Sequence, residues 1–184
     1  MPTDRRFCRF TRSAEEHPFG LRWDQRGGFC ISAFLLLNEP GHPTSVLVGR
    51  IDPTGPWDHL EGLSPERIAA HEGGWHLPAS HLLLREGPEE AAARIAREML
   101  GGATPSLGAP QVISEVYAPR RFPEMPNHWD LSFLYRGTLS PPAPSVPGVW
   151  RELRFVDVRS AAASDFARAH EEVLARAGVP VGRP

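Results

Sequence analysis

Residues 75–101 read WHLPASHLLLREGPEEAAARIAREMLG, and this stretch decides the fold. Its second half predicts a helix that begins near Gly87-Pro88-Glu89-Glu90. Proline is tolerated in the first turn of a helix, and acidic side chains there favour the positive end of the helix dipole. Residues 91–100 are mostly strong helix formers, and the glycine pair at 101–102 is typical of a C-cap. The stretch therefore predicts a loop, one helix and a sharp stop.

The charged residues of this stretch follow a fixed spacing, G-x5-E-x7-R-E-U-x-E-E-x-G, in which U is a bulky apolar residue. The positions that fit it are Ser80, Glu86, Arg94, Glu98 and Gly101. This spacing is the Nudix box, so the segment resembles the Nudix hydrolases, which cleave a nucleoside diphosphate linked to another moiety. Ser80 stands in place of the opening glycine. We call residues 77–102 the box, and the wider resemblance covers residues 29–137.

The resemblance implies a divalent metal site. Glu98 and Glu86, with an acid outside the box, would hold Mg²⁺ or Mn²⁺, and Arg94 would belong to the same site. Such a cation prefers oxygen ligands, neutralises a diphosphate and activates a water for in-line attack on phosphorus. However, Ile95 and Met99 stand where the family places two further metal-ligating glutamates. They share one arc of the helix with Glu98, at about 100° per residue, so the metal site is poorly supplied with ligands.

The same residues have a second interpretation. Glu90, Arg94 and Glu98 are spaced four residues apart, which also suits a solvated salt-bridge ladder on an ordinary surface helix. Ile95 and Met99 would then be core residues.

Residues 118–128, APRRFPEMPNH, form the second segment that can carry chemistry. Arg120 and Arg121 suit phosphate oxygens, because a guanidinium is permanently charged and offers a planar fork of donors. Phe122 can stack on a base, and Glu124 or His128 can act as a general base, a role that some Nudix enzymes give to a loop acid. The alternative is a solvated arginine pair in a proline-stiffened surface turn.

Histidines recur every five residues at His71, His76 and His81. This spacing places them on neither one helix face nor one strand face, and a Gly-Gly turn separates the first from the second. The spacing does not favour a zinc site.

Length and composition indicate one domain spanning residues 1–184 of the α/β class. The chain is 41% hydrophobic and 23% charged, with a net charge of −2, which gives no global electrostatic reason to expect DNA, RNA or a membrane as partner. Two cysteines give no disulfide framework, and the charged N-terminus lacks an apolar signal segment, so we expect a cytoplasmic protein. The expected ligand is a small nucleoside diphosphate derivative, and the sequence does not decide the oligomeric state.

The expected architecture is a Nudix-type α/β/α sandwich with a mixed β-sheet. Residues 1–28 are a lead-in. Strands are predicted at 29–37, 45–51, 75–77, 111–117, 129–137 and 150–158, the first two as a hairpin. Besides the box helix, helices are predicted at 66–72 and within 160–178, the last one capped by Ser164.

Two functions follow. The first is a divergent Nudix hydrolase. The second is a catalytically weak or inactive Nudix-fold module that binds a nucleotide or partner. The environment of Ile95 and Met99 discriminates between them: burial in the core makes their apolar character structural, whereas an open pocket favours binding without hydrolysis.

Overall fold

The structure is a computed structural model that describes residues 8–10, 27–117 and 127–182, with side chains described for 30–115 and 130–182. In chain order its elements are β1 (Cys8–Phe10), β2 (Gly27–Glu39), β3 (His42–Ile51), α1 (Trp57–Leu60), α2 (Pro65–His71), β4 (Ala79–His81), α3 (Pro88–Met99), β5 (Ser106–Tyr117), β6 (Asn127–Thr138), β7 (Trp150–Asp157), the 3-10 turns η1 (Val158–Ser160) and η2 (Ala163–Asp165), and α4 (His170–Arg176).

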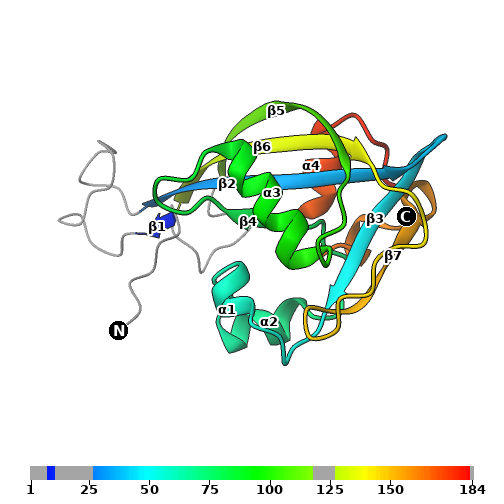
Figure 1. The fold of residues 1–184 in the computed structure, drawn as a ribbon. Helices are drawn as coiled ribbons and strands as arrows, with labels where there is room; N and C mark the ends of the chain where they lie inside the picture. The colour runs from blue at the N-terminus through cyan, green and yellow to red at the C-terminus, as the bar shows by residue number, and fades with distance from the viewer. Residues whose placement is uncertain (1–7, 11–26, 118–126, 183–184) are drawn as a thin grey trace.

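Strand β2 is the central strand of the sheet. One edge of β2 pairs with β6 in parallel from Gly27 to Asn38, and its other edge pairs antiparallel with β1, β4 and β3 in succession. The main path of the sheet runs β5-β6-β2-β3-β7 (Figure 1). The sheet is therefore mixed, as predicted.

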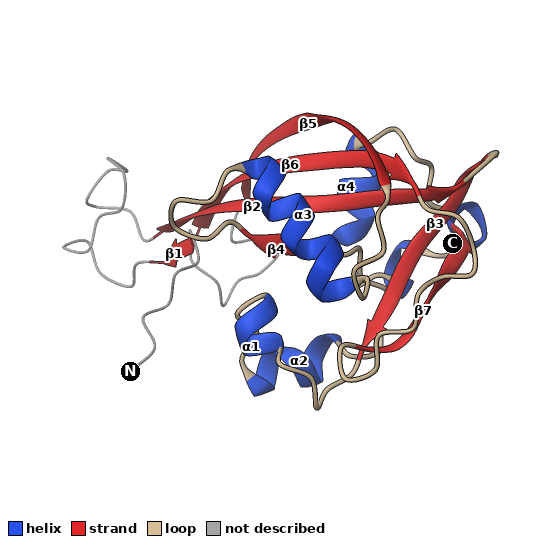
Figure 2. Ribbon diagram, viewed as in Figure 1, coloured by secondary structure: helices blue, strands red, loops and turns tan. Residues whose placement is uncertain are grey.

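Two cores lie on opposite faces of this sheet, because successive side chains of a strand point to opposite sides. Leu35 and Leu37 of β2 join the core beneath α3, whereas Leu36 joins the core that contains Leu174 of α4. Figure 2 shows α3 crossing β2 on the near side and α4 behind the sheet. This confirms the predicted α/β/α layering.

Most elements that depend on local signals form where the sequence predicts them. The hairpin of β2 and β3 turns at Pro40-Gly41, and Ser64 caps α2 by accepting a hydrogen bond from the Arg67 N–H at 3.4 Å. The predicted strand at residues 75–77 is wrong, because Trp75 and His76 make only isolated bridges. In this part of the chain the strand that pairs with β2 is β4, which begins two residues later. Helix α1 lies in a segment for which the sequence predicts neither a helix nor a strand.

The predicted C-terminal helix is much shorter than expected. Ser164 lies in a 3-10 turn, and α4 begins only at His170. The cause is a tertiary contact: the N–H of Trp75 donates to Asp165 O at 2.7 Å, and the N–H of Ala167 donates to Trp75 O at 3.0 Å. These bonds hold Phe166 extended in a parallel bridge with Trp75. Arg168 and Ala169 then take left-handed conformations that a helix cannot contain.

No helix among the described residues is long and apolar enough to cross a membrane.

Candidate functional site

The box helix α3 forms as its sequence predicts. Pro88 occupies its first turn, and the Glu90 carboxylate accepts a hydrogen bond from the Gly87 N–H at 2.7 Å. After the helix, Gly101 and Gly102 have φ of +60° and +80°, a region that favours glycine. This geometry fixes which side chains of α3 face the sheet and which face the preceding loop.

The charged residues of the box form a closed network that we call the box clasp: Ser80, Glu86, Arg94 and Glu98. Arg94 holds Glu86 with two parallel bonds, Nε to Oε1 at 2.7 Å and Nη2 to Oε2 at 2.9 Å. Its guanidinium also donates to Ser80 Oγ at 3.2 Å and to the His81 carbonyl at 2.9 Å. Arg94 is only 7% exposed, so this pair is a buried structural link between loop and helix.

The charge state of the clasp follows from its contacts. Burial alone lowers the pKa of Arg94, but the hydrogen bonds and charge of Glu86 outweigh it, and the pKa is raised. Glu86 also accepts from the Leu83 N–H at 2.8 Å. Both of its oxygens therefore already have donors within the protein.

Glu98 is more accessible than Glu86. Its side chain is 26% exposed, and one oxygen lies 3.4 Å from Arg94 Nη1. The surface ladder expected from the spacing of Glu90, Arg94 and Glu98 is thus only partly present, since Glu90 caps the helix and Arg94 is buried.

Ile95 and Met99 belong to the core. They are 0% and 1% exposed, and they join a buried cluster that includes Trp57 and Trp150. The two indole rings pack edge to face, with their ring centroids 5.1 Å apart, and Trp150 Nε1 donates to the Met99 carbonyl at 2.7 Å. The surface that would carry two metal-ligating glutamates is instead apolar and filled by aromatic side chains.

The donor set of the box does not fit the divalent metal of the resemblance. Of the two glutamates that the resemblance assigns to the metal, Glu98 is partly exposed, and Glu86 is held by Arg94 and the Leu83 N–H. Among the described residues, no group of three His, Cys, Asp or Glu side chains is placed to hold a metal ion. The loop residues Arg120, Arg121, Phe122 and Glu124 lie outside the described residues.

The structure also contains a buried histidine pair that the sequence did not predict. His76 Nε2 lies 3.1 Å from the His71 carbonyl, and the His170 ring meets the His76 ring edge to face at 5.4 Å. His170 Nδ1 accepts a hydrogen bond from the Leu77 N–H at 2.9 Å. Burial lowers the pKa of His76 to about 4 and that of His170 well below its ordinary value. Both rings are therefore neutral at pH 7 and connect α4 to the start of the box.

Acid is expected to destabilise the fold through these rings. The pKa of His76 is about 4 in the folded chain against 6.5 ordinarily, so the unfolded chain binds the proton first as pH falls. The stability that the neutral His76 ring contributes above pH 6.5 is then lost between pH 6.5 and about 4. The free energy of unfolding falls by about 3 kcal/mol for His76 alone. Urea unfolding at several pH values measures this loss. The exposed His42→Gln variant should keep the full slope, and His76→Gln should flatten it. Equal unfolding free energies at pH 7 and 4.5 in the unmodified protein would contradict the assignment.

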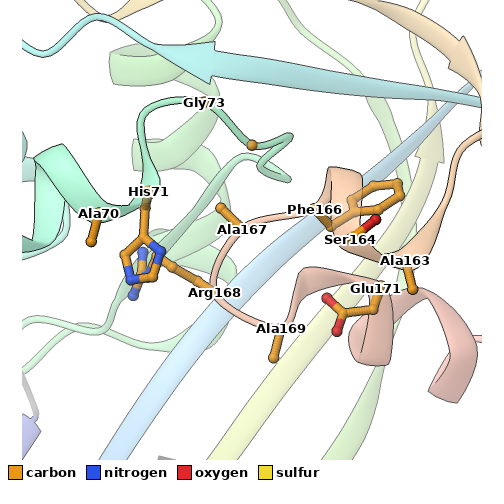
Figure 3. Close-up of a pocket in the computed structure, with 11 residues that line it drawn as sticks. Ala70, His71, Gly73, Ala163, Ser164, Phe166, Ala167, Arg168, Ala169 and Glu171 are labelled. Atoms are coloured by element: carbon orange, nitrogen blue, oxygen red, sulfur yellow. The ribbon is translucent and has the colours of Figure 1, made fainter.

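A cavity of about 540 Å³ lies between the end of α2 and the segment leading into α4. Figure 3 shows His71 and Arg168 on one side of it and Glu171 on the other. Arg168 and Ala169 have φ of +55° and +59°, and Arg168 forms an ion pair with Glu61, which is 1% exposed. Because the buried Glu61 neutralises Arg168, this cavity is a poor place for a diphosphate.

Comparison with known proteins extends these findings. No protein-family model matches the sequence, and no curated protein matches it. Among solved structures, the chain is similar to the MutT protein from Methanosarcina mazei Go1, with 13% identity and a TM-score of 0.51 over 80% of this chain and 91% of that chain. It is also similar to a MutT NUDIX hydrolase from Burkholderia pseudomallei, with 15% identity and a TM-score of 0.52 over 80% of this chain and 96% of that chain. The chain has the Nudix fold, as its box predicts.

Proposed function

We propose that this Nudix-fold protein is a binding module for a small nucleoside diphosphate derivative and that it does not use the metal chemistry of the box. The observation that carries the proposal is the two-bond pairing of Glu86 with buried Arg94, which occupies one of the two carboxylates that the metal would need. The burial of Ile95 and Met99 makes their apolar character structural, so it does not by itself favour binding over hydrolysis, but neither residue supplies a ligand. A core face cannot take up hydrated cations without being unpacked.

A metal-dependent diphosphate hydrolase is the competing function, with Mg²⁺ or Mn²⁺ held by Glu98 and Glu86 and with Glu124 as base. If Glu86 turned to bind a metal in place of Arg94, Arg94 would be a buried guanidinium without its main partner. Removing one partner from a buried ion pair costs about 3–5 kcal/mol. This cost disfavours the hydrolase and supports the binding module.

The proposed ligand contacts come from the loop at residues 118–128. Arg120 and Arg121 would neutralise the diphosphate by charge-assisted hydrogen bonds, and Phe122 would stack on the base. When no metal shares the task, the affinity depends on these arginines more than it does in a metal-driven hydrolase.

The test compares binding and turnover in one panel of nucleoside diphosphates and their sugar esters. Calorimetry is expected to detect binding that is unchanged when EDTA replaces Mn²⁺, and chromatography is expected to detect no product. Arg120→Ala with Arg121→Ala should weaken binding about tenfold or more, and Glu98→Gln should change it little.

The matched control is Arg151→Ala with Arg159→Ala, which removes two charges from side chains that are 57% and 62% exposed. This control should bind as the unmodified protein does. Turnover that requires Mn²⁺ and disappears in Glu98→Gln would overturn the proposal in favour of the hydrolase.

A further inference from the structure

The box clasp holds one exposed arginine in a strained position. Arg85 has φ of +68°, in the left-handed region that non-glycine residues rarely occupy. It sits in a tight turn closed by the Glu86 N–H donating to the Leu83 carbonyl at 3.0 Å. The Glu86 carboxylate braces the same turn through the Leu83 N–H and is itself fixed by Arg94. The clasp thus fixes the backbone of the turn that carries Arg85.

A cavity of about 400 Å³ lies beside this turn, on the flank of α3 away from Ile95 and Met99. Its lining combines the box turn with exposed positions of the helix: Leu83, Leu84, Arg85, Ala93 and Arg97, together with Glu86, Glu90 and Arg94. This volume falls in the range of small-molecule sites. The cavity is therefore large enough for a ligand that contacts both the turn and the helix.

Among the described residues, the cations of this cavity without a carboxylate partner are Arg85 and Arg97. Arg94 is paired with Glu86 and Glu98, and the Glu90 carboxylate accepts a hydrogen bond from the Gly87 N–H. Arg85 and Arg97 are exposed, and in the described part of the chain no ion pair or hydrogen bond of their guanidinium groups is found. Two guanidinium groups on the rim of one cavity are suited to the oxygens of a phosphate or diphosphate.

The apolar part of the lining indicates that the ligand also has an organic portion. Leu84 is 49% exposed, and among the described residues Val112 is the only other large hydrophobic side chain that is exposed. Leu83 and the small Ala93 line the same cavity. These side chains offer a surface to a ring or chain attached to the anion.

We propose that this outer groove of the box, lined by Arg85, Arg97 and Leu84, binds the phosphate or diphosphate group of a small organic phosphate. The clasp positions Arg85, the helix supplies Arg97, and Leu84 contacts the organic portion. This site is independent of the contacts proposed for the loop at 118–128 and of whether the protein cleaves its ligand.

The experiment titrates pyrophosphate, ADP and adenosine by calorimetry in EDTA at low ionic strength. In a background that carries Arg120→Ala with Arg121→Ala, so that the proposed loop contacts are absent, Arg85→Ala with Arg97→Ala is expected to weaken pyrophosphate and ADP binding about a hundredfold, roughly tenfold for each arginine. The control variant Arg151→Ala with Arg159→Ala changes net charge equally and should bind normally. Amide chemical shifts should move at Leu84, Arg85, Ala93 and Arg97 when pyrophosphate is added.

Two further measurements separate this site from its alternatives. Arg85→Gly relieves the left-handed strain while removing the guanidinium, so it should raise Tm and still lose about tenfold in affinity. ADP should bind more tightly than pyrophosphate, because only ADP has an organic portion that Leu84 can contact. Leu84→Ser should reduce this difference in affinity without changing the affinity for pyrophosphate. Equal affinities of the double variant and its control would overturn the proposal. If a glutamate pentapeptide binds and pyrophosphate does not, the proposal is overturned and the groove is assigned to an acidic protein segment instead.

Discussion

Replacing Ile95 and Met99 together by glutamate is expected to abolish the folded state rather than to restore a metal site. Both side chains are within the core, 0% and 1% exposed, against Trp57 and Trp150. An ionised carboxylate in such surroundings costs several kcal/mol, and a domain of this size is stable by only about 5–15 kcal/mol. Loss of the cooperative thermal transition and of the native elution volume would be the measured result.

Three variants serve as controls for this result. Ala93→Glu adds a carboxylate to an exposed position of the same helix and should change the unfolding free energy by less than about 0.5 kcal/mol. Ile95→Leu and Met99→Leu conserve volume and should each cost less than about 1.5 kcal/mol. A folded double-glutamate protein that binds Mn²⁺ tightly would mean that this face opens readily, and the binding-module proposal would fail with it.

Arg94→Ala is expected to lower the unfolding free energy by about 3–5 kcal/mol, because it leaves Glu86 mostly buried without its partner. The two side chains are 8% and 12% exposed and share two hydrogen bonds. Urea unfolding at pH 7 measures the loss. In addition, the turn that carries Arg85 should become mobile, which faster amide exchange at Leu83 would detect.

The comparison variant for this prediction is Glu98→Gln. Glu98 is 26% exposed and lies 3.4 Å from Arg94, so its loss should cost less than about 1 kcal/mol. Combining Arg94→Met with Glu86→Leu removes both charges and should recover much of the stability lost in Arg94→Ala. Equal effects of Arg94→Ala and Glu98→Gln would show that the clasp is not a buried pair.

The sequence predicts α3 well because the signals that start and end it are local. Pro88 and Glu90 lie in its first turn and Gly101 follows its end, so no distant contact is needed to set its bounds. The last helix is different. Ser164 is a good cap by its residue type, but the strand-like bonds of Trp75 to Asp165 and Ala167 hold that segment in another path. Tertiary hydrogen bonds override a local preference there.

The environment of Ile95 and Met99 could not be predicted from spacing alone. An apolar pair on one helix arc suits a core and an apolar pocket equally. The choice depends on α1, which carries Trp57 and lies where the sequence predicts no helix. The ion pair of Glu61 and Arg168 escaped prediction for a related reason. Its members are far apart in sequence, and neither belongs to a periodic pattern. Long-range pairing leaves no local signal.

The parallel pairing of β2 with β6 sets the order in which this chain can fold during its synthesis. Gly27 pairs with Asn127 and Asn38 with Thr138. Strand β2 therefore pairs with a strand that is synthesised about a hundred residues later. At roughly 5–20 residues per second, the ribosome needs on the order of 5–20 s to supply that partner. Throughout this interval Leu35, Leu36 and Leu37, fully buried in the finished fold, lack one neighbour. The apolar side chains of β2 therefore stay exposed to aggregation for longer than those of a local hairpin, and the sheet closes only after β6 has been made.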